Sequence, residues 1–334
     1  MIRATLAVPG DLSSPTGGYA YARALLAAGP EAGLALDHLA LPGGFPLPDG
    51  AALEAAAGAL SAAPPDQPLL IDGLALGALP GWALDRVRAP MAALLHHPLH
   101  LETGLPQTEA AALEASERAA LARVGPVIVT SRATAEAAAR LFGVETARLR
   151  VAPPGVARGP RAPLCGDPPT ILCIGSLTPR KAQDVLIEAL ARLADRPWRA
   201  ALVGPEPDPE FAARLRALAE ARGVADRVAF RGALPRAEVD AAMAAADLFC
   251  SPSIYEGYGM AYAEAMARGL PVVSARHKAA EEVIGDAGAL VPPRNAAALA
   301  TALAPLLDDA ALRRRAGAAA RRRAESFPRW SDAA

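Results

Sequence analysis

The chain has 334 residues, which is enough for two α/β domains of about 150 residues each, and 52% of them are hydrophobic. The formal net charge is −1, and the two basic triplets, 313–315 and 321–323, lie on an Ala-rich helical stretch without aromatic residues between them. This pattern is typical of a solvated helix face rather than of contact with a membrane surface or nucleic acid, so we expect no nucleic-acid partner.

The cysteines and the N-terminus predict the compartment. Three cysteines without metal-ligand spacing indicate reduced thiols. The N-terminus lacks a signal-peptide pattern, and no apolar run reaches the ~20 residues of a membrane-spanning helix. We therefore expect a cytoplasmic protein without a transmembrane segment.

In the first half, apolar strand-like runs alternate with helical runs. The predicted elements are strand 5–8, helix 19–28, strand 34–39, helix 51–62, strands 68–71 and 90–95, helix 108–123, strand 126–130, helix 134–142 and strand 149–152. The Pro- and Gly-rich stretch that follows has no apolar period, and it predicts an interdomain linker at 158–169.

A second alternating series follows the linker. The predicted elements are strand 170–174, helix 181–194, strand 200–203, helix 209–222, strand 228–230, helix 236–245, strand 247–250, helix 260–268, strand 271–273, a turn at 291–293, and helices 297–307 and 310–326. Two such series predict an α/β protein of two doubly wound Rossmann-like domains that face each other across a cleft. The predicted boundaries are 1–157 for the N-terminal domain, 170–318 for the C-terminal domain and 319–334 for a tail that can pack back toward the N-terminal domain.

Two groups of residues in the first half fall at predicted strand ends. Gly17 and Gly18 open a helix, where they either let a ligand approach the backbone or simply make a tight turn. His96, His97 and His100 follow the strand 90–95. A metal site is disfavoured because the spacing supplies no fourth ligand. We expect either one histidine at the ligand-binding edge of the sheet or plain polar loop residues.

The stretch 175–181 is the first candidate site of the second half. Gly175 and Ser176 follow a strand, and Arg180 and Lys181 stand at the start of the predicted helix. Cations are unfavourable at a helix N-terminus unless an anion is shared with them. A diphosphate fits this arrangement, whereas the alternative is that both side chains reach into water. The sequence has no Asp-x-Asp pair to hold a metal against a diphosphate, so we expect a site that needs no metal and no other cofactor.

The stretch 251–264 is the second candidate site. Glu256 lies in a turn with Gly257 and Gly259, and Glu264 follows in the next helix. Free N–H groups and the positive end of the helix dipole favour an anionic or hydroxyl-rich ligand there. The two carboxylates suit a ligand that also carries hydroxyl donors, such as a nucleotide sugar. The alternative is an ordinary Gly-rich turn with a solvated glutamate on a surface helix.

These motifs together resemble those of the retaining GT-B glycosyltransferases of family 4, the group 1 type. Glu256 to Glu264 resembles the E-x7-E pattern of that family, and the segment 175–181 resembles its G-R/S-L…R/K-K-G segment, with Ala182 where a glycine is usual. Gly17 and Gly18 resemble its N-terminal glycine loop. The resemblance follows nearly the whole chain and is more specific in the C-terminal half.

The resemblance implies a metal-independent hexosyl transfer with retention, from a UDP- or GDP-sugar to an unidentified acceptor. It implies that His96 and Glu256 are the catalytic residues, with Glu256 also contacting the hexose. The implied diphosphate-binding residues are Gly17, Gly18, Gly175, Ser176, Arg180, Lys181, Gly259 and Met260. The implied sugar- and ribose-binding residues are His97, Glu256, Gly257, Tyr258 and Glu264.

Two other functions stay open at this point. One is an epimerase or phosphorylase with the same fold, although no lysine stands in a pyridoxal-phosphate context. The other is a non-catalytic subunit that only binds nucleotide sugars. Release of nucleotide from a sugar donor would distinguish an enzyme from a pure binder.

Overall fold

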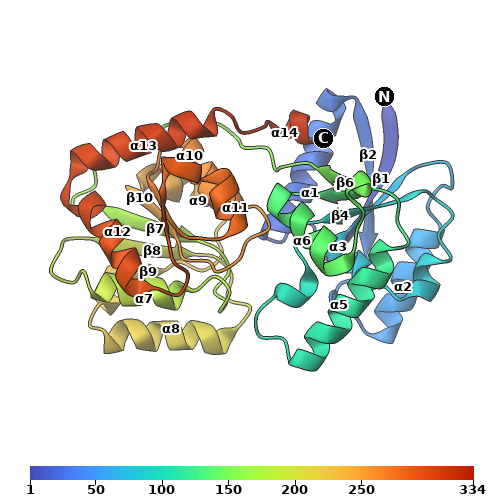
Figure 1. Ribbon diagram of the computed structural model, residues 1–334, viewed down its shortest axis with the longest axis horizontal. Helices are drawn as coiled ribbons and strands as arrows, with labels where there is room; N and C mark the ends of the chain where they lie inside the picture. Colours follow the sequence, from blue (N-terminus) through green and yellow to red (C-terminus); the bar gives the residue numbers. More distant parts are fainter. The chain divides into compact units, whose positions relative to one another are not determined.

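A computed structural model describes residues 1–334 and divides the chain into two compact units (Figure 1). Unit 1 consists of Met1–Gly155 and Pro328–Ala334, and unit 2 consists of Val156–Phe327. Each unit contains one six-stranded sheet in which all paired strands are parallel.

Unit 1 is a doubly wound sheet with the strand order β2-β1-β3-β4-β5-β6. Its strands are β1 (Ile2–Pro9), β2 (Leu34–Leu41), β3 (Leu69–Asp72), β4 (Met91–Leu95), β5 (Val127–Val129) and β6 (Leu149–Val151). Its helices are α1 (Gly17–Ala28), α2 (Gly50–Ser61), α3 (Gly73–Leu76), α4 (Gly81–Leu84), α5 (Gln107–Leu121), α6 (Arg132–Phe142) and α14 (Trp330–Ala333), with the 3-10 turns η1 (Gly29–Ala32), η2 (Leu99–Leu101) and η3 (Thr146–Arg148).

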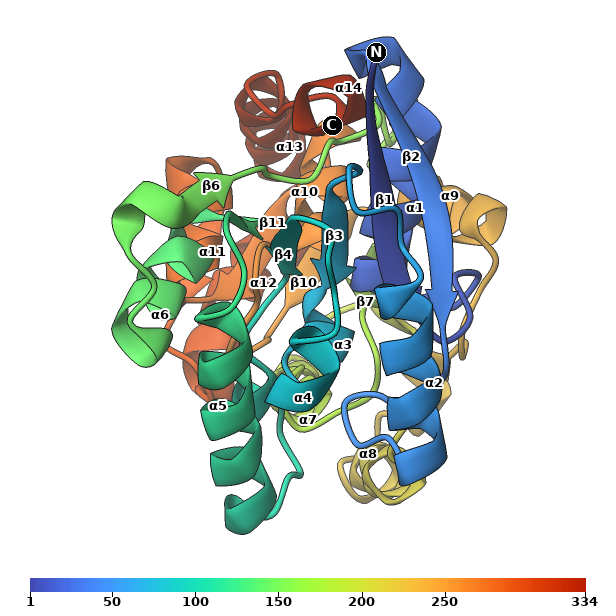
Figure 2. The same cartoon turned by 90° about the vertical axis from the view of Figure 1, so that its right-hand side faces the viewer.

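Both faces of the unit 1 sheet are covered by helices (Figure 2). Successive residues of a strand point to opposite faces. Accordingly, Leu6 and Val8 of β1 pack with α1, whereas Ala7 joins the core that contains α2. Burial on both faces explains why the strands of this sheet are continuous apolar runs rather than alternating ones.

Unit 2 repeats the design with the strand order β12-β11-β10-β7-β8-β9. Its strands are β7 (Thr170–Ile174), β8 (Arg199–Val203), β9 (Val228–Phe230), β10 (Leu248–Ser251), β11 (Val272–Ala275) and β12 (Ala289–Val291). Its helices are α7 (Gln183–Ala191), α8 (Pro209–Ala221), α9 (Arg236–Ala245), α10 (Met260–Ala267), α11 (Lys278–Val283), α12 (Ala296–Asp308) and α13 (Ala310–Ala324), with the 3-10 turns η4 (Ala225–Arg227) and η5 (Gly285–Ala287).

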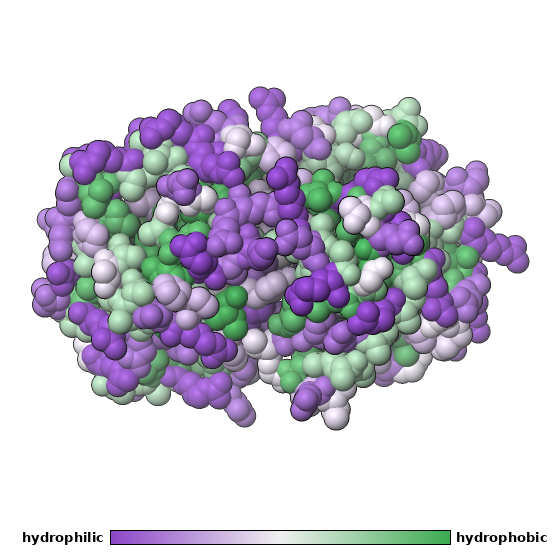
Figure 3. All heavy atoms as spheres, viewed as in Figure 1, coloured by the Kyte–Doolittle hydropathy of each residue, from purple (hydrophilic) through white to green (hydrophobic).

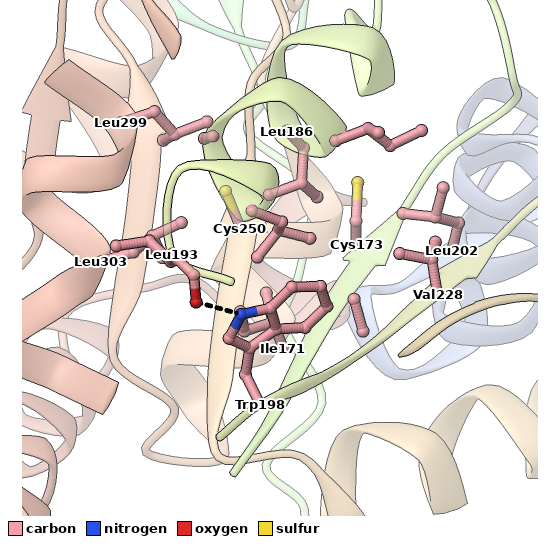
Figure 4. Close-up of a cluster of buried hydrophobic side chains, with 14 of the residues drawn as sticks. Ile171, Cys173, Leu186, Leu193, Trp198, Leu202, Val228, Cys250, Leu299 and Leu303 are labelled. Atoms are coloured by element: carbon pink, nitrogen blue, oxygen red, sulfur yellow. Dashed lines mark hydrogen bonds between the residues drawn. The ribbon is translucent and has the colours of Figure 1, made fainter. Parts of the chain in front are cut away.

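The core on one face of the unit 2 sheet is built around Trp198, which is fully buried (Figure 4). Its indole N–H donates to the Leu193 carbonyl at 2.8 Å, so the polar end of the ring is satisfied inside the core. Cys173 and Cys250 lie in the same core, and burial raises the pKa of the Cys173 thiol to about 12. These two cysteines are therefore buried free thiols of low reactivity, whereas Cys165 is exposed.

Residues 158–169, which were predicted to be a linker, are part of unit 2. Ala162 and Leu164 are buried in its core, and the Ala162 N–H donates to the Arg268 carbonyl. Asp247 accepts the Gly166 N–H at 2.9 Å. The stretch lacks an apolar period because it packs as an irregular segment that is neither helix nor strand.

The arginine triplets of α13 are only in part a solvated face. Arg313, Arg321 and Arg323 donate to backbone carbonyls at the C-terminal ends of three other helices, α12, α10 and α11. These carbonyls have no partner within their own helices. A long arginine side chain at a helix crossing can reach such carbonyls and satisfy them. Arg314 and Arg315 of the first triplet are exposed, so the prediction of a solvated face holds only for part of the triplets.

Few large hydrophobic side chains are exposed. On the face shown in Figure 3, hydrophobic residues are interspersed with hydrophilic ones. The large exposed hydrophobic side chains are Met1, Ile2, Leu47, Trp82 and Val151. None of the helices combines the length and the apolar character needed to cross a membrane.

Candidate functional site

Each sheet has one point at which the strand order reverses direction, and ligands of such sheets bind outside the strand ends at that point. In unit 2 the reversal lies between β7 and β10, and in unit 1 between β1 and β3. The stretches 175–181 and 252–259 directly follow β7 and β10. The topology therefore brings the two candidate stretches of the second half to one place, and the Ile254 N–H joins them by donating to the Arg180 carbonyl at 3.0 Å.

The centre of this candidate site in unit 2 is a buried ion pair between Lys181 and Glu256. The Lys181 Nζ and Glu256 Oε1 atoms are 2.6 Å apart, and Arg180 Nη1 lies 3.5 Å from Glu256 Oε2. The three side chains are 12–18% exposed. Burial alone would raise the pKa of Glu256, but Lys181 and Arg180, together with a hydrogen bond from Ser253, hold the pKa at about 2. Glu256 is therefore ionised.

Gly175 makes room for the lysine. A Cβ on Gly175 would lie 3.2 Å from Lys181 Cδ, so a larger residue would displace that side chain. The helix α7 begins at Gln183, two residues later than predicted, because Ala182 adopts the left-handed conformation with φ 53°. Glycine adopts that conformation without strain, which accounts for the glycine that is usual there. Lys181 thus precedes the helix instead of opening it.

The turn from β10 into α10 is shaped by Gly259. This residue has φ +100°, and its added Cβ would lie 1.7 Å from the Tyr262 ring. The Tyr262 hydroxyl donates to the Tyr258 carbonyl. The Tyr258 side chain is itself 7% exposed and packs in the core, so only the backbone of Tyr258 is available to a ligand.

Glu264 does not join Glu256. Its two carboxylate oxygens both accept from Arg236 Nη1, each at 2.9 Å, and Arg236 also pairs with Asp240. Glu264 is 12% exposed, whereas Arg236 is 52% exposed. The carboxylate is therefore fixed in the protein, while its partner can turn toward solvent.

His96 is the centre of the candidate site in unit 1, which lies near the strand-order reversal of that sheet. Its Nε2 lies 3.2 Å from Asp72 Oδ2, and the Tyr21 ring packs against the imidazole in a T-shaped arrangement with a centroid distance of 5.2 Å. Asp72 ends β3 and also accepts the Leu74 N–H at 2.8 Å. An added Cβ on Gly18 would lie 3.5 Å from the imidazole, so this glycine lies directly beside His96. Gly17 begins α1 in the same unit.

His97 and His100 have different neighbours from His96. His97 Nε2 lies 3.5 Å from Glu102 Oε2, and His100 Nδ1 lies 4.0 Å from Glu117 Oε2. Burial raises the pKa of Glu117 to about 8. The three histidines thus separate along the loop after β4, and no group of three or more His, Cys, Asp or Glu side chains is placed to hold a metal ion.

Sequence reasoning missed three residues that lie beside these candidate residues: Asp72, Arg236 and His277. Asp72 is a single acid after an apolar run, and Arg236 is a helix residue far along the chain from Glu264. The only available signal was that Asp72 and His277 lie at or just after strand ends, as the candidate residues do.

The cations of the candidate site in unit 2 can exchange Glu256 for another anion. Two buried cations share one carboxylate, so an incoming anion with two charged oxygens meets cations that are already positioned. The carboxylate that shares these cations can then accept hydrogen bonds from hydroxyl donors of the ligand. Such a site suits a ligand that brings negative charge together with hydroxyl groups.

Comparison with known proteins finds glycosyltransferases among the relatives of this chain. Residues 161–323, most of unit 2, match the family model described as glycosyl transferases group 1. A GDP-mannose-dependent alpha-(1-6)-phosphatidylinositol monomannoside mannosyltransferase of Mycolicibacterium smegmatis is 36% identical over 219 residues, which cover 58% of this chain and 56% of that protein. A D-inositol 3-phosphate glycosyltransferase of Xylanimonas cellulosilytica is 30% identical over 280 residues, 76% of this chain and 66% of that protein. The alignments thus span between about half and two thirds of these relatives.

The fold has close counterparts among solved structures. A sucrose-phosphate synthase from Thermosynechococcus elongatus superposes with a TM-score of 0.83 at 23% identity, covering 99% of this chain and 96% of that one. This likeness shows the fold, two Rossmann-like domains of the GT-B type.

Proposed function

We propose that this chain, in which residues 161–323 match the group 1 glycosyl transferase family, is a retaining, metal-independent hexosyltransferase that uses a nucleoside diphosphate sugar as donor. The observation that carries the proposal is the buried Lys181–Glu256 pair, with Arg180 beside it, at the strand-order reversal of unit 2. It supplies positive charge for a diphosphate and an ionised carboxylate for the sugar in one place.

The proposal assigns the diphosphate to Arg180 and Lys181. Gly175 leaves room for the Lys181 side chain, Gly259 shapes the turn over the Tyr262 ring, and the N–H groups at the start of α10 add donors. When a diphosphate binds, Arg180 and Lys181 pair with its phosphate oxygens as well as with Glu256. No divalent metal is then needed to neutralise the leaving group.

The two carboxylates have separate roles in the proposal. Glu256 contacts the hexose and stabilises the positive charge that develops at the anomeric carbon. Glu264 accepts from the ribose hydroxyls, for which the exposed Arg236 side chain moves aside. His96 of unit 1 acts in the transfer step, and retention follows from attack on the face from which the diphosphate leaves.

The names of two relatives narrow the choice of donor and sugar. One relative is described as GDP-mannose-dependent, and we propose a GDP- or UDP-hexose for this chain, with GDP-mannose as the first candidate.

The function is tested by incubating the protein with GDP-mannose, UDP-glucose and ADP-glucose and measuring the nucleotide that is released. We expect slow release from one donor without an acceptor, and the anomeric configuration of a captured product to match that of the donor. Thermal stabilisation by a donor without any release would instead indicate a non-catalytic binding subunit. An undiminished rate in excess EDTA is expected for a metal-independent site.

Asp72→Asn is expected to lower kcat about 10- to 100-fold with little change in donor KM, because a hydrogen bond to a charged group contributes about 1.5–3 kcal/mol. The amide still accepts the Leu74 N–H but presents an N–H₂ group to His96, so the imidazole loses its charged partner. Steady-state kinetics with the active donor give the measurement.

The matched control is Asp49→Asn, which makes the same change at an N-cap in the same unit, where Asp49 accepts the Ala52 N–H at 2.8 Å. Asp49→Asn should leave kcat unchanged. Equal loss in both variants would assign the effect of Asp72 to folding rather than to His96.

A further inference from the structure

His277 has a buried ring nitrogen that no other group of the protein satisfies. The residue follows β11, and its Nδ1 accepts the Ala280 N–H at 3.3 Å, which caps α11. Its Nε2 is buried and has no hydrogen-bond partner. Buried polar atoms nearly always have a partner, so this atom calls for an explanation.

The cap determines which nitrogen carries the hydrogen. Nδ1 accepts from Ala280 and is therefore unprotonated, so the hydrogen of the neutral ring resides on Nε2. Burial lowers the pKa of His277, which favours the neutral ring. The Nε2 atom is thus a buried N–H donor without an acceptor.

His277 also lies at the same sheet edge as the proposed donor site. The strands β10 and β11 are parallel neighbours, and Glu256 and His277 follow their C-terminal ends. The charges of Glu256, Lys181 and Arg180 all act on the imidazole. The unsatisfied donor therefore belongs to the surroundings of the Lys181–Glu256 pair.

We propose that His277 is a donor-binding residue, whose Nε2–H hydrogen-bonds an oxygen of the nucleoside diphosphate sugar, either on the hexose or on the diphosphate. This inference rests on the proposed function and adds to it a residue that none of the family motifs contains. The capping bond holds the ring in place before the donor arrives, so little side-chain entropy is lost on binding.

Two substitutions separate capping from donor binding. In His277→Asn the side-chain oxygen takes the place of Nδ1 and keeps the cap, but the side chain ends short of Nε2. In His277→Gln the amide N–H reaches the position of Nε2, but the cap is lost. We expect His277→Asn to keep the unfolding midpoint and to raise the donor KM about 5- to 10-fold, the effect of one lost hydrogen bond. We expect His277→Gln to lower the midpoint and to hold the donor KM within about twofold.

The opposite pattern, a normal KM in His277→Asn and a raised one in His277→Gln, would overturn the inference and leave His277 as a helix cap only. Titration with the free nucleoside diphosphate identifies the acceptor oxygen. Weaker binding in His277→Asn assigns it to the diphosphate, and unchanged binding together with a raised donor KM assigns it to the hexose.

The wild-type protein separates failure of this inference from failure of the proposed function. If wild type releases no nucleotide from GDP-mannose, UDP-glucose or ADP-glucose, the proposed function fails and the inference with it. If wild type is active and His277→Asn matches it in KM and in affinity for the free diphosphate, only the inference fails.

Discussion

Glu256→Gln is expected to lower kcat about 100- to 1,000-fold, the usual effect of removing one electrostatic contact to a transition state. Affinity for the free nucleoside diphosphate should not weaken. The wild-type carboxylate is ionised, because Lys181 and Arg180 hold its pKa at about 2, and it is 12% exposed. A fixed negative charge in such surroundings stabilises developing positive charge on a sugar ring, whereas the neutral amide does not.

The unchanged or tighter diphosphate binding follows from the ion pair itself. In the wild-type protein Glu256 competes with an incoming diphosphate for Lys181, whose Nζ lies 2.6 Å from the carboxylate. The amide competes less but still offers an oxygen to the lysine. Alanine would be a poorer test, because removal of one partner of a buried pair costs about 3–5 kcal/mol of folding stability.

Glu188→Gln is the matched control for Glu256→Gln. Glu188 pairs with Arg222 at 2.6 Å in the same unit, but on α7 and away from the strand-order reversal. Isothermal titration with GDP and UDP gives the affinities, and the donor assay gives kcat. If Glu256→Gln weakened diphosphate binding as much as it lowered kcat, the separate roles of Glu256 and Lys181 would be wrong.

Much of the fold could be predicted because its strands are buried apolar runs that end at Gly, Pro or polar residues. The bounds predicted for β7, β9 and α9 agree with the structure residue for residue. The elements α3, α4, α11 and β12 were missed. They have three to six residues each, too few to show a period, and α11 is capped by a histidine instead of one of the usual capping residues.

The site was predictable in position but not in pairing. Strand ends in alternating βα series locate the candidate residues at one sheet edge, whatever their partners are. The partners themselves are distant in the sequence: Lys181 and Glu256 are separated by 75 positions, His96 and Asp72 by 24. Lys181 was expected to hold only a diphosphate, because the pairing depends on the order β7-β10, which no local pattern encodes.

Gly259→Ala is expected to destabilise unit 2 by about 2–5 kcal/mol, because two costs add at one residue. The first is the backbone, since φ +100° lies in a region that L side chains rarely adopt. The second is steric, since the new Cβ would lie 1.7 Å from Tyr262 Cζ. Tyr262 is a core residue that is 1% exposed, so its ring has little room to move. Relief requires the ring to move, which breaks the hydrogen bond to the Tyr258 carbonyl and shifts the turn that carries Glu256.

Gly223→Ala provides the comparison that isolates the ring. Gly223 also has a positive φ, +68°, but an added Cβ there would meet nothing within 4 Å. Denaturant unfolding should show a loss of about 1 kcal/mol in Gly223→Ala, the backbone cost alone, and a distinctly larger loss in Gly259→Ala. Donor turnover should fall only in the latter.

In a Tyr262→Ala background the extra cost of Gly259→Ala should shrink, because the colliding ring is gone and the two changes couple. If Gly259→Ala cost no more than Gly223→Ala, the packing of Tyr262 under the turn would not be what fixes the position of Glu256.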